Sequence, residues 1–181
     1  MEAKKMSTRK EVEGNMEDKI IPTHRQCKIK IENKHSEYSL CNPQVYIESG
    51  SCEETLTTEI KPSESGSGLF IKTPNAACGA VGVFTYSLLH VPSNQYKGKL
   101  GVMFSNPYDF NLFDNWYAVG IFAMDKSCDE GLYQEMYYNT ESGFVRRKAS
   151  DPAVTYTDRG VTVNASMSDS YEPVIELNLH N

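Results

Sequence analysis

The chain has 181 residues, of which 39% are hydrophobic and 23% are charged, a composition typical of one soluble globular domain. Its net charge of -6 argues against a general affinity for nucleic acid, because phosphate-dominated binding needs a basic face. No window contains the roughly 20 apolar residues that a membrane-spanning helix requires.

The N-terminal segment 1–21 is highly charged and weakly patterned. Its apolar residues are too sparse to form an apolar helical stripe, so we expect disorder or a weak helix before a folded domain at 22–181. The segment also lacks the apolar core of a secretory signal. This absence favours a cytoplasmic or peripheral membrane protein.

From residue 26 onward, the patterns are typical of β-strands. In the stretch 26–33, Cys27, Ile29 and Ile31 alternate with polar residues. The stretch 77–91 holds too many glycines and β-branched residues for a helix and predicts a long central strand. Further strands are expected at 44–49, 55–60, 100–104, 116–124, 160–165 and 174–180. Short strands separated by turn residues predict a mainly β, two-sheet β-sandwich.

Three segments are expected outside the strands. The composition of 61–68, KPSESGSG, indicates a flexible loop, and the basic run 146–148 is typical of a solvated turn. The segment 125–139 predicts a short helix, because Ser127 or Asp129 is a suitable N-cap and acidic residues follow.

Large apolar side chains gather in the predicted loop 106–117, where turn residues surround Phe110, Leu112, Phe113, Trp116 and Tyr117. On the predicted helix, Tyr133 and Tyr137 share a face, with Tyr138 beside them. These rings are typical of a sandwich core. They are also suited to a cage that holds a quaternary ammonium by cation–π attraction. The residues alone leave both interpretations open.

No motif indicates catalysis or a resident metal. The four histidines are scattered, and neither a phosphate-binding glycine loop nor a nucleophile elbow is present. The five cysteines are odd in number and widely spaced, which favours reduced thiols that are mostly buried. We therefore expect no enzyme and no cofactor.

Several motifs resemble those of the actinoporins, the pore-forming cytolysins of sea anemones. They are VYIESGS at 45–51, CGAVGVFTY at 78–86, the aromatic stretch at 100–122 and CDEGLYQEMYYN at 128–139. The resemblance implies a β-sandwich flanked by short α-helices and a site for the phosphocholine headgroup of sphingomyelin. The cysteines and the missing signal favour an intracellular relative from outside the cnidarians.

The resemblance carries over residue by residue. The implied phosphocholine-binding residues are Ser49, Val81, Ser105, Pro107, Phe113, Tyr133, Tyr137 and Tyr138. The implied membrane-contact residues are Leu112, Phe113, Trp116 and Tyr117. Leu112 and Tyr117 stand where the family has tryptophan, and Phe113 stands where it has tyrosine. Arg25 resembles a basic residue that precedes the first strand.

The charged segment 1–21 departs from the amphipathic N-terminus by which the family enters bilayers. Burying one charge near the bilayer centre costs ~2.5–3.5 kcal/mol, which argues against pore formation by that route. We therefore expect a peripheral protein that binds phosphocholine lipids. The alternatives are a pore-forming cytolysin that oligomerises on membranes and a glycan-binding lectin, because fungal lectins resemble the same sandwich.

Overall fold

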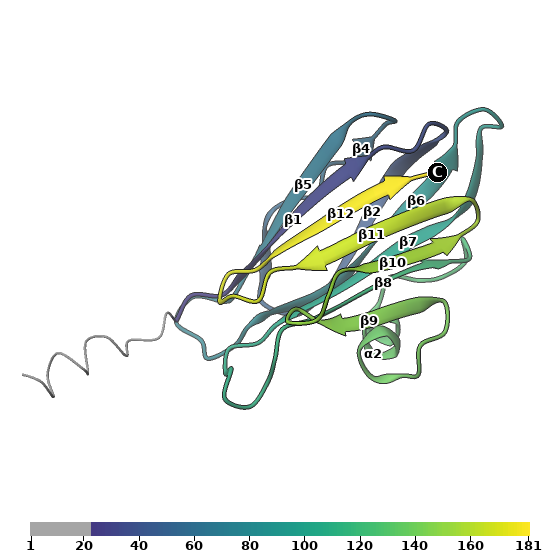
Figure 1. Cartoon of the computed structure of the whole chain (residues 1–181). Coiled ribbons are helices and arrows are strands. Elements are labelled where there is room, and N and C mark those ends of the chain that lie inside the picture. Colours follow the sequence, from purple (N-terminus) through teal and green to yellow (C-terminus); the bar gives the residue numbers. More distant parts are fainter. Residues whose placement is uncertain (1–22) are drawn as a thin grey trace, which may run out of the picture.

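Strands with alternating burial form two sheets that pack face to face (Figure 1). The computed structural model describes residues 23–181, and the predicted N-terminal segment 1–21 lies outside them. The mainly β two-sheet sandwich predicted from the sequence is confirmed. Within the described residues, one short helix accompanies the sheets.

The first sheet joins the two ends of the described chain. Its β1 and β12 pair in parallel at the centre, and the remaining neighbours pair antiparallel. In spatial order the strands are β10 (Val154–Asp158), β11 (Val161–Met167), β12 (Val174–His180), β1 (Gln26–Asn33), β5 (Ser65–Ile71) and β3 (Ser51–Glu54).

The second sheet is antiparallel throughout and contains the long central strand predicted for 77–91. In spatial order the strands are β4 (Glu59–Ile60), β2 (Tyr38–Ser49), β6 (Ala80–His90), β7 (Gln95–Asn106), β8 (Trp116–Phe122) and β9 (Phe144–Lys148). The chain between β7 and β8 is the loop predicted to be rich in large apolar side chains.

The main core lies between the two sheets. Its centre is an aromatic cluster in which Phe70 of the first sheet stacks on Phe104 of the second, with 4.4 Å between ring centroids. Phe84 lies 6.3 Å from Phe70 and completes the cluster. These three rings lie outside the loop 106–117 and the predicted helix, so they do not decide between the two interpretations of the rings there.

The helix α2 (Glu130–Tyr138) covers the outer face of the second sheet (Figure 1). It begins after the predicted N-cap Asp129, whose Oδ1 accepts a hydrogen bond from the Leu132 amide at 2.9 Å. Leu132 and Met136 are buried against Met103 of β7 and form a second apolar cluster. The helix is thereby fixed to the sheet.

The prediction of a flexible loop at 61–68 is wrong in its second half, because residues 65–68 begin β5 and pair with β1. The glycines there permit close packing. A Cβ on Gly66 would lie 2.2 Å from Ile60 Cδ1, and one on Gly68 would lie 2.6 Å from Leu56 Cδ2. A glycine-rich composition therefore marks a site of close approach in this strand.

The prediction of a solvated turn at 146–148 is also wrong, because these residues form part of the edge strand β9. Arg146 donates hydrogen bonds from one guanidinium nitrogen to the carbonyls of Met136 and Asn139, each at 2.9 Å. Its charge therefore satisfies the C-terminal end of α2.

Three smaller expectations are corrected. Residues 55–58 separate β3 from β4 and are not in a strand, while β10 was not predicted at all. Of the five cysteines, Cys27 and Cys41 are buried and the other three are partly exposed, so the expectation of mostly buried thiols is met only by these two. All five are unpaired in the structure.

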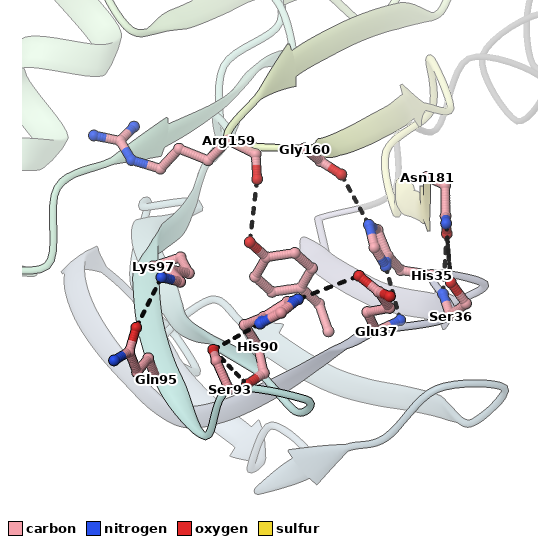
Figure 2. A network of polar contacts seen from close by, with 11 residues as sticks. His35, Ser36, Glu37, His90, Ser93, Gln95, Lys97, Arg159, Gly160 and Asn181 are labelled. Carbon is pink, nitrogen blue, oxygen red and sulfur yellow. Dashed lines mark hydrogen bonds and ion pairs between the residues drawn. The ribbon is translucent and has the colours of Figure 1, made fainter.

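A polar network joins the two sheets at the end of the sandwich remote from the loop 107–115 (Figure 2). The Tyr38 hydroxyl donates to the Arg159 carbonyl at 3.2 Å, and His35 Nε2 lies 2.8 Å from the Gly160 carbonyl. The Tyr38 ring contacts both His35 and His90. We call these five residues the closing network, because hydrogen bonds and ring contacts join them to one another.

Candidate functional site

The strand register brings three of the predicted headgroup residues into one row. Ser49 of β2 lies opposite Val81 of β6, and Val81 lies opposite Ser105 of β7. The row continues to Trp116 of β8 and Lys148 of β9. Directly opposed residues of antiparallel strands point to the same face, so these side chains share one face of the sheet.

The tyrosines of α2 lie over that face. Tyr133 is buried and stacks on the half-buried Tyr137 at 5.7 Å between centroids, while Tyr138 meets Tyr137 edge-on at 4.7 Å. Tyr137 also shares a side-chain hydrogen bond with Ser105, which connects the helix to the row on the sheet. Tyr138 is 69% exposed, so this set of rings opens to solvent at its end.

Tyr46 of β2 extends the set of rings in the other direction. Its ring centroid lies 6.4 Å from that of Tyr133, and its hydroxyl donates to Glu48 Oε2 at 2.7 Å. We call Tyr46, Tyr133, Tyr137 and Tyr138 the tyrosine row. The sequence-based prediction missed Tyr46 and Glu48, although both lie in the motif VYIESGS, three residues and one residue before the predicted Ser49.

Each phenol with a resolved shift in the tyrosine row is held in its neutral form. Burial raises the pKa of Tyr133 and, to a smaller extent, that of Tyr137. The hydrogen bond to Glu48 raises the pKa of Tyr46 to about 12. Neutral phenols offer an electron-rich ring face to a cation and a hydroxyl donor to an anion.

The loop 107–115 presents two apolar side chains to solvent, because Leu112 is 73% exposed and Phe113 is 54% exposed. Their backbone amides donate to the Asp109 carbonyl at 3.3 and 3.0 Å, and the Asn111 amide donates to Asp109 Oδ1 at 2.9 Å. The loop tip is therefore an ordered turn. Both residues remain candidates for membrane contact.

Of the other two predicted membrane-contact residues, only Trp116 reaches the outer face. Its ring lies 5.4 Å from Lys148 Nζ, which also pairs with Asp114 at 3.2 Å. Tyr117 is 1% exposed and belongs to the core between the sheets, where its hydroxyl donates to the Ala165 carbonyl. Its assignment as a membrane-contact residue is wrong, because successive side chains of a strand point to opposite faces.

Pro107 is buried at the base of the loop, and its carbonyl accepts a hydrogen bond from Arg25 Nε at 3.0 Å. Arg25 also donates to the Tyr108 carbonyl at 2.7 Å. Its guanidinium lies 4.9 Å from the centroid of Phe110 and 4.8 Å from that of Tyr171. Arg25 therefore ties the base of the loop to the start of β1, beside a pocket of about 310 Å³.

The predicted headgroup residues thus divide into two groups. The register and the helix gather one group on the outer face of the second sheet: Ser49, Val81, Ser105, Tyr133, Tyr137 and Tyr138. Pro107 and Phe113 belong to the loop that follows β7. The backbone of that loop connects them to the row through Ser105.

Within residues 23–181, no helix is long and apolar enough to cross a membrane. The same part of the chain contains no cluster of three histidine, cysteine or acidic side chains arranged to hold a metal ion.

The sequence matches a family model described as sea anemone cytotoxic protein over residues 7–177. It is 33% identical to DELTA-thalatoxin-Avl1b of Actineria villosa over 67% of this chain and 51% of that protein, so the chain spans about half the length of the first such relatives. Bryoporin of Physcomitrium patens is 26% identical over 91% of this chain and 89% of its own.

The fold also resembles that of solved structures with little sequence identity. The lipid binding protein Nakanori superposes with a TM-score of 0.65 at 10% identity, covering 97% of this chain and 79% of its own. At this identity the likeness concerns the fold alone.

Proposed function

Because this chain belongs to the sea anemone cytotoxic protein family, the actinoporins, we propose that it binds membranes peripherally by recognising phosphocholine headgroups such as that of sphingomyelin. The tyrosine row beside Ser105 is the observation that supports this proposal. A quaternary ammonium binds to neutral aromatic faces with about 0.5–2 kcal/mol per ring, depending on desolvation. Ser105 is buried and hydrogen-bonded to Tyr137, whose half-buried hydroxyl is suited to donate to the adjoining phosphate.

The ligand binds over the outer faces of the rings. Tyr133 and Tyr137 are stacked with 5.7 Å between centroids. Rings with centroids this close are in contact with each other, so a methylated ammonium cannot lie between them. Tyr138 and the half-buried Tyr137 provide accessible surface, and Ser105 lies beside them.

The loop supplies the second contact with the membrane. Leu112 and Phe113 are exposed apolar side chains on an ordered turn that follows the Ser105 strand. Fully burying such a side chain contributes about 1.5–3 kcal/mol. Trp116, half-buried at the end of the same loop, is a residue type favoured at the depth of lipid headgroups.

Vesicle pelleting tests this function directly. The full chain should sediment with vesicles that contain sphingomyelin and should bind more weakly to vesicles in which ethanolamine lipids replace every choline lipid. Tyr137→Ala should weaken binding to sphingomyelin vesicles about tenfold. Tyr96→Ala is the matched control, because Tyr96 is exposed at the opposite end of β7. Equal binding by Tyr137→Ala, with an unchanged circular dichroism spectrum, would remove the tyrosine row from the site.

A pore-forming cytolysin is the second candidate, favoured by the family match and by relatives named as toxins. Encapsulated dye separates the two. We expect binding without leakage, because the segment 1–21 is heavily charged and has few apolar residues. Leakage that is lost when residues 1–21 are deleted, with binding retained, would establish the cytolysin. Competition by a glycan where phosphocholine fails would favour a lectin.

A further inference from the structure

Glu48 occupies an unusual position beside the tyrosine row. In the pairing of β2 with β6, Ile47 lies opposite Gly82 and Ser49 lies opposite Val81, so Glu48 is an extra residue in the ladder. Such a bulge redirects the side chains of its strand. The Glu48 carboxylate accepts the hydrogen bond of Tyr46, whose ring packs against Tyr133. The bulge therefore brings this carboxylate to the edge of the tyrosine row.

Among the described residues, the carboxylate has no cationic partner. Within residues 23–181, no basic side chain forms an ion pair with Glu48. Its hydrogen-bond donor is a neutral phenol, which leaves its negative charge uncompensated. Glu130, at the first turn of α2, adds a second negative charge that acts on Tyr46.

Two basic side chains lie on the side of the tyrosine row that is away from Tyr46. Lys148 lies at the end of the row that runs from Ser49 across the sheet, and Arg146 lies on the same strand two residues before it. Arg146 is bound to the helix carbonyls, and Lys148 is paired with Asp114. The outer face is thus acidic next to Tyr46, whereas the basic side chains beyond Trp116 are bound to Asp114 or to the helix carbonyls, with the tyrosine row and Ser105 between.

We propose that Glu48 determines the specificity of this site, selecting ligands that carry an alkylated ammonium and disfavouring ligands of net negative charge. The inference rests on the proposed function, whose headgroup it orients. The ammonium points toward Glu48 and Tyr46, and the phosphate points away from them toward Ser105 and Tyr137. Attraction by Glu48 adds to the cation–π attraction of the rings, and its repulsion of phosphate excludes the reversed orientation.

The test removes the charge and keeps the shape. Glu48→Gln retains an acceptor for Tyr46, and Glu48→Asp retains the charge. Glu176→Gln, on an exposed position of β12 in the other sheet, is the control with the same change in net charge. Binding of each full-length variant is measured on sphingomyelin vesicles with and without about one fifth phosphatidylserine. A second titration uses soluble tetramethylammonium and inorganic phosphate, followed by tyrosine and tryptophan fluorescence.

We expect Glu48→Gln to bind sphingomyelin vesicles about fivefold more weakly and to lose most of the preference for vesicles without phosphatidylserine. Glu48→Asp should retain that preference, and Glu176→Gln should match the native chain. The difference in vesicle affinity between Glu48→Gln and the native chain should shrink as the salt concentration is raised, because Glu48 is exposed and its charge is screened.

The possible failures are distinguishable. If the native chain binds choline vesicles and Glu48→Gln behaves as Glu176→Gln, the role of Glu48 is overturned and the proposed function stands. If the native chain ignores vesicles but binds tetramethylammonium in a manner that depends on Glu48, the specificity stands and the membrane function fails. Binding of neither probe overturns both.

Discussion

The closing network and the tyrosine row are built from similar residues and differ in how their polar groups are satisfied. In the closing network, the Tyr38 hydroxyl and the His35 ring bond to backbone carbonyls of the turn between β10 and β11 (Figure 2). In the tyrosine row, the hydroxyls of Tyr46 and Tyr137 bond to side chains on the outer face, and Tyr138 is largely exposed. One end of the sandwich has its groups paired across the sheets, whereas the other presents them to solvent.

The difference teaches that aromatic content alone does not indicate a binding site. A buried polar group paired within the protein stabilises the fold, because breaking the pair leaves a desolvated partner. A half-exposed ring contributes less to folding and retains its face for a ligand. Substitutions in the closing network should therefore change stability, whereas those in the tyrosine row and the loop should change binding.

The largest effect is expected for Tyr38→Ala. This buried side chain contacts His35 and His90 and bonds to Arg159, so its loss should lower the free energy of unfolding by about 3–5 kcal/mol. Urea denaturation measures the change. Vesicle binding per folded molecule should stay at the native level. A loss below about 1 kcal/mol would show that the network does not hold the sheets together.

Asn33→Ala should have the next largest effect. The Asn33 amide donates to the carbonyls of Tyr38 and Ile60 at 2.7 and 3.0 Å, and its Oδ1 accepts from the His35 amide. Removing it leaves buried groups unpaired, at a cost of about 1–3 kcal/mol. The control is Asn111→Ala in the exposed loop, expected within about 0.5 kcal/mol of the native chain in the same denaturation. Equal free energies of unfolding for the two variants would show that this end of the sandwich contributes no more to stability than the exposed loop does.

Leu112→Ala should leave stability within about 0.5 kcal/mol and weaken vesicle binding about tenfold, because each buried methylene contributes about 0.8 kcal/mol. Val91→Ala is the control, since Val91 is an exposed apolar residue at the opposite end of the sandwich. Pelleting with sphingomyelin vesicles compares them. If both variants bind equally well, the loop does not insert.

The smallest of the four effects predicted here is a loss of stability at alkaline pH, caused by the buried phenol of Tyr133. Burial raises the pKa of Tyr133, so the folded state holds this proton more tightly than the unfolded chain does. Its contribution is complete below the ordinary tyrosine pKa near 10 and is lost as the pH rises further. Thermal melts between pH 8 and 11 should show this decline. Tyr133→Phe should reduce the slope of melting temperature against pH. An unchanged slope would mean that other groups cause the decline.

Local patterns in the sequence correctly predicted much of the fold. The alternation at 26–33 indicated β1, and the β-branched run at 77–91 indicated β6, because burial on one face or both leaves its pattern in adjacent residues. Asp129 predicted the start of α2 for a similarly local reason. The motifs around Ser49, Ser105 and Tyr137 indicated the family, and the register then placed Ser49 and Ser105 on the face of the sheet that α2 covers with Tyr137.

Contacts between distant segments decided the rest. Whether Tyr117 faces the core or the membrane depends on the pairing of β8 with β7, and the close packing of Leu56 and Ile60 holds the glycines of 65–68 in a strand. The bulge that brings Glu48 beside Tyr46 forms only where β2 meets β6, more than thirty residues further along the chain. By itself, the sequence determined the β-rich class of the fold, the longer strands, the helix and the family motifs. Only the tertiary structure decided which side chains meet, because those meetings depend on register and packing between segments that no local pattern records.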